Sequence, residues 1–470
     1  MKWSRADVAD NTTDEPLVTR RPVHVALVSL GCAKNLVDSE KMLGQLAEAG
    51  CVITSDAGDA DAIVVNTCGF LAAARDEALQ AIRDVVRLKR KGRCRRVVVV
   101  GCLVQRDGTE LLQQVKGIDA LVGVHNRDDV VRAVLARPTK GPRTVDTYLG
   151  DYHPFVHTDT ARLRITPPHY AYLRISEGCD QKCTFCTIPA IRGPMHCKPP
   201  TVVLAEAREL IADGAVELNL IGQDTTSYGL DANEGFGLAG LLRQLNRLDG
   251  ARWIRLLYAY PTTLTDEMID AIAECDRVVK YVDIPLQHIN DRVLKAMARQ
   301  VTRAQTERLI ETLRTRIPGL HIRTTLIAGF PGETDAEFEE LVRFIRETRF
   351  DALGVFAYSL EPDTPAGRMK GQVPERIKQQ RVDRLMRVQQ EIAFAQADAL
   401  AGQELEVLIE GPPVDGLQPA RHAGQAPEVD AVTLLQNSNA APGQFIRVIC
   451  TGRRDYDLLA RPAESKLPAV

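Results

Sequence analysis

Residues 174–194 read RISEGCDQKCTFCTIPAIRGP and carry three cysteines in a C-x3-C-x2-C pattern, Cys179, Cys183 and Cys186. Three thiolates this close together suit three of the four irons of a 4Fe–4S cluster. Because the run holds no fourth cysteine, one iron is left open for a ligand that is not protein. The run also follows a strand-like segment, 171–176, and so lies at the strand end where α/β barrels place their chemistry.

Zinc is the alternative occupant of this motif. Zinc prefers two C-x2-C pairs or a fourth His or Cys nearby, and His196 and Cys197 are candidates for that fourth ligand. Plain buried thiols are the second alternative, because cysteine is often buried.

Alternating strand-like and helix-like segments surround the motif. Strands are expected at 171–176, 217–221, 253–258, 281–285, 321–328 and 353–359, with helices between them, for example at 201–213 and 302–316. Six such units predict a partial (β/α)6 barrel. A long helix is expected after them, at 375–399.

An α/β unit earlier in the chain carries three further cysteines. Its expected strands, 24–30, 62–66 and 96–100, each precede a helical stretch and predict an open parallel sheet. Cys32, Cys68 and Cys102 each follow one of these strands. Parallel strands end at a common edge, so the three thiols should converge there; three separately buried cysteines are the alternative. Four other cysteines lack such a placement and are expected to be structural or incidental: Cys51, Cys94, Cys275 and Cys450.

The composition is that of a globular protein. Of 470 residues, 45% are hydrophobic and 26% are charged, which excludes a disordered chain. With 59 Lys and Arg against 62 Asp and Glu, a mainly electrostatic nucleic-acid binder is not expected. The apolar runs are too short to span a bilayer and the N-terminus lacks an apolar signal core, so we expect a cytoplasmic protein. Eleven cysteines in such a protein indicate metal or redox chemistry.

Breaks in these patterns divide the chain into five expected segments. They are a disordered tail at 1–20, a cluster-binding α/β domain at 21–137, a Pro- and Gly-rich linker at 138–168, the barrel domain at 169–399 and a small all-β module at 400–465. Within the module, strands are expected at 404–409, 428–435, 444–450 and 457–460.

The C-x3-C-x2-C motif, with Phe185 before its last cysteine, resembles that of the radical S-adenosylmethionine (SAM) enzymes. The resemblance implies that the amine and carboxylate of SAM bind the open iron, and that one electron then releases a 5′-deoxyadenosyl radical that abstracts a hydrogen. It also implies that Gly222 and Gln223 approach the methionyl part of SAM, although a plain polar loop is the alternative.

The segment TTLIAGFPGE, 324–333, ends a barrel strand with a Gly-Pro-Gly turn. Glycine allows close approach of a nucleoside, so Thr325, Gly329 and Glu333 are candidate SAM contacts. An ordinary strand-to-helix turn capped by Thr334 or Asp335 is the alternative. His288, after DIPLQ, is a candidate for lining the cavity, and a core histidine with satisfied hydrogen bonds is the preferred alternative.

The two cysteine sets together resemble the methylthiotransferases, which have an N-terminal cluster domain, a radical SAM barrel and a C-terminal TRAM module. The resemblance covers residues 22–462, and the matching stretches are SLGCAKNLVDSE, VNTCGF, RISEGCDQKCTFCTIPAIRGP, DIPLQH, TTLIAGFPGET and VFAYSLEPDTPA. It implies a second 4Fe–4S cluster on Cys32, Cys68 and Cys102, whose open iron presents sulfur to the substrate radical. It also implies an electron donor such as flavodoxin or ferredoxin and leaves the sulfur donor open.

The charge of the last module indicates the substrate. This family acts on tRNA adenosine or, in one branch, on a ribosomal protein. Residues 400–470 hold six basic and nine acidic side chains, which disfavours tRNA and suits a basic protein; Glu428 and Asp430 are expected to face that partner. The stretch 421–430 resembles the ribosomal-protein branch, although Ala431 and 437–442 depart from it. The expected target is an aspartate β-carbon of small-subunit ribosomal protein S12.

Two alternatives to this function remain. One is a tRNA adenosine methylthiotransferase, and the other is a non-catalytic iron–sulfur adaptor on the ribosome. An adaptor would gain nothing from an open iron.

Overall fold

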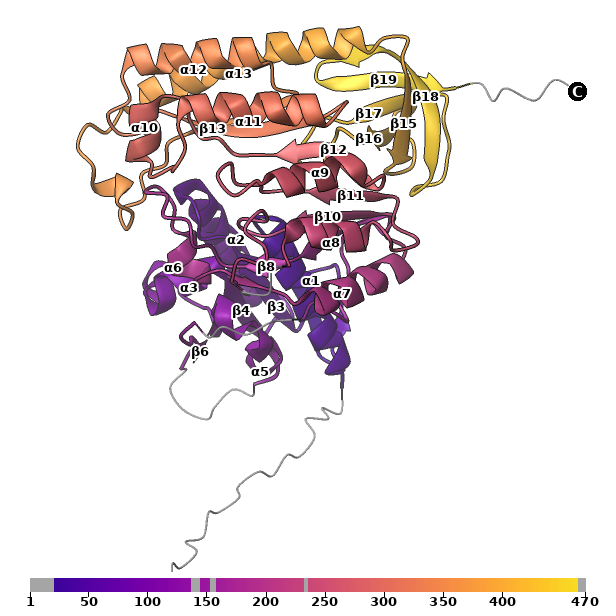
Figure 1. Cartoon of the computed structure of the whole chain (residues 1–470). Helices are drawn as coiled ribbons and strands as arrows, with labels where there is room; N and C mark the ends of the chain where they lie inside the picture. Colours follow the sequence, from indigo (N-terminus) through magenta and orange to yellow (C-terminus); the bar gives the residue numbers. More distant parts are fainter. Residues whose placement is uncertain (1–20, 137–143, 153–157, 232–235, 464–470) are drawn as a thin grey trace, which may run out of the picture.

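The chain folds into three units that follow one another in sequence (Figure 1). The computed structural model describes residues 21–136, 144–152, 158–231 and 236–463. The tail expected at 1–20 lies outside these ranges. Within them, no helix combines the length and apolar composition that crossing a membrane requires.

The first unit is a parallel sheet with the strand order β2–β1–β3–β4–β5–β6. Its central strands are mostly apolar, β3 is buried along its length and β4 is buried except at its two ends, which suits a sheet covered on both faces. Strand β6 lies inside the stretch expected to be a linker and extends the sheet beyond β5. The elements are β1 (His24–Ser29), α1 (Ala33–Glu48), β2 (Val52–Ile53), β3 (Ala62–Thr67), α2 (Ala72–Lys91), β4 (Arg96–Gly101), α3 (Cys102–Asp107), η1 (Gly108–Glu110), α4 (Leu111–Gln114), β5 (Ala120–Val122), η2 (Val124–Asp129), α5 (Val130–Leu135) and β6 (Asp146–Tyr148).

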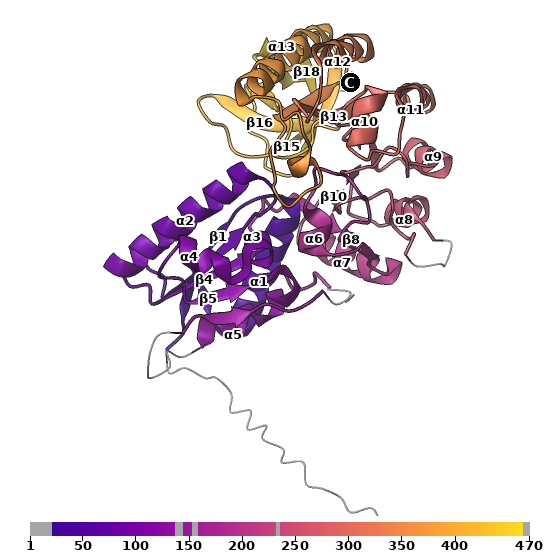
Figure 2. The same ribbon diagram turned by 90° about the vertical axis from the view of Figure 1, so that its left-hand side faces the viewer.

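The second unit confirms the partial barrel. Its six parallel strands stand in sequence order, β7–β10–β11–β12–β13–β14, and Figure 2 shows α8, α9 and α11 on the side facing away from the first unit. The elements are β7 (Tyr170–Arg174), β8 (Ser176–Glu177), α6 (Ile188–Arg192), β9 (His196–Cys197), α7 (Pro200–Ala212), β10 (Glu217–Ile221), α8 (Leu238–Leu245), β11 (Trp253–Leu256), α9 (Asp266–Glu274), β12 (Val278–Asp283), α10 (Asp291–Ala296), α11 (Arg303–Arg316), β13 (His321–Ala328), α12 (Asp335–Thr348), β14 (Ala352–Ala357), η3 (Ala366–Arg368) and α13 (Glu375–Ala399).

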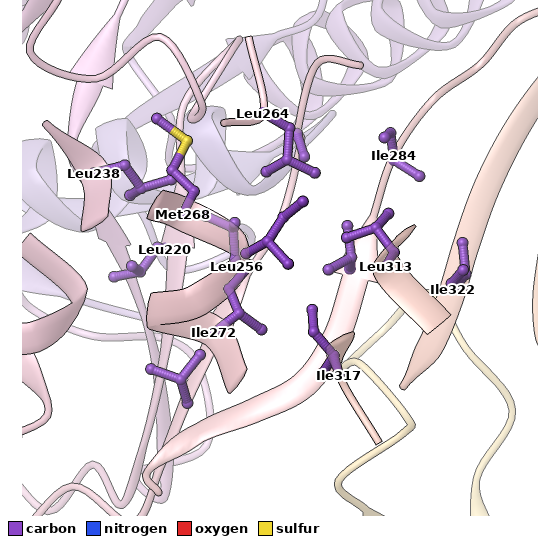
Figure 3. Packing of buried hydrophobic residues seen from close by; sticks show 14 of the residues in the cluster. Leu220, Leu238, Leu256, Leu264, Met268, Ile272, Ile284, Leu313, Ile317 and Ile322 are labelled. Atoms are coloured by element: carbon purple, nitrogen blue, oxygen red, sulfur yellow. The ribbon is translucent and has the colours of Figure 1, made fainter. Parts of the chain in front are cut away.

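The largest hydrophobic core lies between this sheet and its helices. Leu220 of β10 and Leu256 of β11 pack with Met268 and Ile272 of α9, and Leu313 of α11 lies beside them (Figure 3). The barrel strands are therefore held rigidly from outside, which fixes the positions of the loops at their ends.

The third unit is a closed five-stranded barrel, as expected for an all-β module. The expected strand at 428–435 begins only at Thr433, and the strand containing Pro419 was not expected, because proline inside a run argues against a strand. The strands are β15 (Glu404–Ile409), β16 (Leu417–His422), β17 (Thr433–Gln436), β18 (Phe445–Arg454) and β19 (Asp457–Pro462).

Buried charges join the third unit to the second. Glu217 of β10 is fully buried between Arg255 of β11 and Arg421 of β16, at 2.8 and 2.6 Å. The rings of Trp253 and Phe445 meet edge to face, with centroids 4.8 Å apart. These contacts place the module against the barrel.

Candidate active site between the three units

The first cysteine set converges as the topology predicts. Cys32, Cys68 and Cys102 follow β1, β3 and β4, which are neighbours in the sheet. A Cβ atom on Gly31 would lie 2.9 Å from the Cβ of Cys68, and one on Gly69 would lie 2.7 Å from the carbonyl oxygen of Cys102. Only glycine allows the loops to approach this closely.

Asn35 of α1 connects all three cysteine loops. Its side-chain amide donates to the carbonyl oxygens of Leu30 and Thr67, at 3.1 and 2.9 Å, and these residues precede the first two cysteine loops. Its Oδ1 accepts from the thiol of Cys102 at 3.4 Å. Asn35 was not among the residues expected from the sequence; the available signal was an amide three positions after Cys32, on a face of α1 that is buried.

The second set occupies the loop between β8 and α6. The thiol of Cys186 accepts from the backbone N–H of Ile188 at 3.5 Å, and that of Cys183 accepts from Arg299 at 3.6 Å. Cys179 is nearly buried. The loop therefore presents its three thiols at the carboxyl end of the barrel strands.

The thiol environments fit iron clusters. Burial raises the pKa of Cys179 to about 11 and the pKa values of Cys102 and Cys186 to about 12. Burial would also raise the pKa of Cys32, but Lys34 is among the cations that lower it below its usual value. Burial raises the pKa values of Cys51, Cys94 and Cys275 as well, so the raised values show that the thiols are buried. A cationic centre such as ligated iron would stabilise the thiolates and lower these pKa values.

The zinc alternative finds no support in the geometry. The thiol of Cys197 accepts from the backbone N–H of Gly229 at 3.2 Å, and His196 contacts the hydroxyl of Tyr152 at 3.1 Å. Across the described residues, no three His, Cys, Asp or Glu side chains gather as ligands of a single ion.

Arg192, the last residue of α6, connects the two cysteine sets. It is 1% exposed and donates to Oδ1 of Asn35 at 2.6 Å and to Oδ2 of Asp38 at 2.9 Å. Its other nitrogen donates to Glu177, two residues before Cys179. One guanidinium thus contacts residues next to both cysteine sets. This link was not expected from the sequence.

A cavity of about 530 Å³ lies where the three units meet. Cys32 and Phe70 line it from the first unit, Phe185 and Thr325 from the second, and Pro427 to Val429 from the third. The cavity therefore touches a cysteine of one set and the motif loop of the other.

Only some of the residues expected to contact SAM line the cavity. Phe185 and Thr325 line the cavity. Both polar atoms of the Gln223 side chain are buried, with no hydrogen-bond partner among the described residues, as suits a side chain that awaits a ligand. A Cβ atom on Gly222 would lie 2.5 Å from Oγ of Ser176, so this loop needs glycine for packing as well.

Glu333 is engaged inside its own turn. One carboxylate oxygen accepts from the backbone N–H groups of Gly329 and Phe330, at 2.6 and 3.0 Å, and the other lies 3.1 Å from Arg381. Thr334 caps α12 in a capping box. These contacts favour a structural role for Glu333 over the expected SAM contact.

The remaining candidates lie in cores. His288 is fully buried, its Nδ1 accepts from the backbone of Asn290 at 3.0 Å, and burial lowers its pKa to about 3. It is a core histidine, as expected. The four cysteines expected to be structural or incidental are all buried: Cys51, Cys94, Cys275 and Cys450.

Glu428 and Asp430 do not form the free acidic rim that the sequence suggested. Glu428 accepts from the hydroxyls of Tyr170 and Tyr172, both at 3.0 Å. Asp430 accepts from the hydroxyl of Tyr281 at 2.7 Å and also contacts Arg323. Both carboxylates face the barrel because the preceding loop turns inward, so charge reversal here would disturb docking of the module.

Comparisons with known proteins agree with this architecture. Residues 24–123 match the uncharacterized protein family UPF0004, residues 173–345 the radical SAM superfamily and residues 401–462 the TRAM domain. A solved methyltransferase, TsrM from Kitasatospora setae with tryptophan and a SAM analogue bound, is 17% identical, with a TM-score of 0.53 over 88% of this chain and 80% of that one. At that identity the likeness shows the fold alone.

Curated relatives are much more similar. The protein named ribosomal protein uS12 methylthiotransferase RimO from Anaeromyxobacter sp. strain K is 47% identical, over 93% of this chain and 92% of that protein. Its namesake from Symbiobacterium thermophilum is 45% identical, over 95% and 92%. The chain therefore belongs to the RimO family of radical SAM methylthiotransferases.

Proposed function

We propose that this enzyme transfers a methylthio group to the β-carbon of an aspartate in ribosomal protein uS12 and that it holds two 4Fe–4S clusters. Cys179, Cys183 and Cys186 would bind one cluster, and the set of Cys32, Cys68 and Cys102 would bind the other. The observation that carries this proposal is the cavity, which is lined both by Cys32 and by the loop of the second set.

When bound, the cluster on Cys179, Cys183 and Cys186 would pass an electron to SAM, SAM would supply the hydrogen-abstracting radical, and the other cluster would present sulfur, whose donor is left open. The protein itself binds and orients the cofactors and the substrate, and it excludes water from the site. Phe185 and Thr325 would provide walls, and Gln223 would provide an unpaired amide for a polar ligand. Gly222 and Gly329 stay predicted SAM contacts; the backbone of Gly222 packs against Ser176 and that of Gly329 against Lys378. Asn35 and Arg192 would keep the two sets at a constant separation.

The substrate and partners are inferred from the relatives, which are named for uS12. The acidic surplus of the TRAM module does not indicate the substrate, because Glu406, Glu428 and Asp430 contact side chains of the barrel. A ribosomal substrate suits a cytoplasmic enzyme, and flavodoxin or ferredoxin suits the need for an electron donor.

Iron content tests the ligand assignment. Anaerobic reconstitution should give about eight irons per chain, and Cys179→Ala should remove roughly half of them. Cys275→Ala, a buried cysteine outside both sets, should leave the iron content unchanged. An unchanged iron content in Cys179→Ala would exclude the assignment.

Product analysis tests the division of labour. Replacing Cys32, Cys68 and Cys102 together by alanine should preserve 5′-deoxyadenosine formation but abolish methylthio transfer. Wild-type enzyme given both uS12 and tRNA should add about 46 Da, CH2S, to uS12 only. The same gain on tRNA adenosine, with uS12 unchanged, would overturn the proposed substrate.

A further inference from the structure

Lys34 is a buried cation that has no carboxylate partner among the described residues, and the ionisable group that it influences is the thiol of Cys32. It lies two residues after Cys32, is 7% exposed, and its Nζ atom stands 3.2 Å from the centroid of the Tyr258 ring. Within the described parts of the chain, no carboxylate pairs with this ammonium group. Buried charges are normally paired, because an unpaired charge loses its hydration without compensation.

The local structure makes this position unfavourable for a lysine. Lys34 occupies the first turn of α1, which contains no acidic residue. A cation there meets the positive end of the helix dipole. An aliphatic side chain would fill the same space without either cost, and such local conflicts concentrate at functional sites.

The surroundings of Lys34 belong to the cavity at the junction of the three units. Cys32, Ala33 and Tyr258 all line this cavity. The ring of Tyr258 therefore holds the ammonium group beside the cavity, next to the first cysteine set.

The charges around the cavity leave Lys34 as the cation without a carboxylate partner among the described residues. Lys34 does not itself line the cavity; its ammonium group lies against the ring of Tyr258, which does. Arg323 lines the cavity but lies between Asp283 and Asp430, at 3.1 and 3.3 Å, and Glu428 adds a further negative charge to the lining. An anion that enters the cavity is repelled by these carboxylates and attracted by Lys34, whose ammonium group must turn from the Tyr258 ring to reach it.

Backbone strain at the same cavity points to function. Among the described residues, nine non-glycine residues have a positive φ, and three of them line this cavity: Tyr258, Gln287 and Glu428. Strain of this kind is retained where a site needs a particular geometry. At Tyr258, with φ of 60°, it holds the ring that carries Lys34.

We propose that Lys34 binds the carboxylate of the substrate side chain that enters this cavity, and so determines the preference for an acidic target. The inference rests on the proposed function, in which that side chain is an aspartate. The ammonium N–H groups donate to the carboxylate oxygens, which positions the adjacent methylene carbon beside the first cysteine set. An amide in place of the carboxylate would lose the charge interaction.

The test compares two peptides that carry the target loop of uS12 with either Asp or Asn at the modified position. Dissociation constants are measured by fluorescence anisotropy on cluster-loaded enzyme with SAM bound. Wild type should prefer the Asp peptide by about 10- to 100-fold, the range of a charged hydrogen bond. Lys34→Gln should lose this preference, Lys34→Arg should keep most of it, and the exposed control Lys116→Gln should match wild type. Because each preference is a ratio within one protein, a partly folded preparation does not distort it.

Two results would overturn the role of Lys34. One is a Lys34→Gln enzyme that still prefers the Asp peptide, and the other is a loss of SAM affinity with peptide preference intact, which would assign Lys34 to the cofactor. A wild-type enzyme that leaves intact uS12 unmodified would instead refute the proposed function. The two failures are therefore distinguishable.

Discussion

Replacing Arg192 by methionine should break the link between the two cysteine sets. Arg192 belongs to a buried network that joins the first and second units and contains four cations and four carboxylates: Arg127, Arg174, Arg192 and Lys198 with Asp38, Glu177, Asp159 and Glu206. Methionine fills a similar volume but leaves one buried carboxylate without compensation. Breaking a buried pair in this way typically costs about 3–5 kcal/mol.

Urea unfolding of Arg192→Met and wild type gives the free-energy difference by linear extrapolation. The matched control is Arg132→Met, whose partner is Asp129 and whose side chain is 73% exposed; it should change stability by less than about 0.5 kcal/mol. The double variant Arg192→Met/Asp38→Asn should recover part of the loss, because it removes the surplus charge. A loss in Arg192→Met no larger than in the control would refute the reasoning.

Three further outcomes are expected. Burial would raise the pKa values of Asp38 and Asp159, but Arg174 and other cations hold both below their usual range; their contribution to stability is therefore present above the unfolded pKa of about 3.9 and is lost as pH falls through the lower folded pKa. Burial lowers the pKa of His288 to about 3, so acid titration followed by circular dichroism should show a stability loss that begins near the unfolded histidine pKa of about 6.5, with the contribution of Asp38 and Asp159 lost only below about pH 4. Stability that stays constant down to about pH 4 would contradict this. Thr302→Ala removes the capping-box bond from the Gln305 backbone N–H to the Thr302 hydroxyl, keeps the reciprocal bond from the Thr302 backbone N–H to the Gln305 side chain, and should cost about 0.5–2 kcal/mol in thermal unfolding; no change would show that the cap is dispensable. Glu428→Ala leaves two tyrosine hydroxyls without their acceptor and should speed proteolysis between α13 and β15, whereas Glu428→Gln should not.

The sequence by itself determined the chemistry and the layout of the units. Cysteine spacing and strand–helix alternation are local properties, and the parallel sheet converts them into position because its strands end at one edge. That reasoning placed Cys32, Cys68 and Cys102 together without any knowledge of packing, and the structure brings them to the same edge.

Only the tertiary structure decided which side chains connect the units. Arg192 and Asn35 are 157 positions apart, and Lys34 meets Tyr258 across a boundary between units. Charge counting placed Glu428 on the surface, and the residue is exposed, but the hydroxyls of Tyr170 and Tyr172 donate to its carboxylate, which charge counting does not indicate. Such contacts depend on how whole faces pack, and residue spacing along a chain carries no record of that packing.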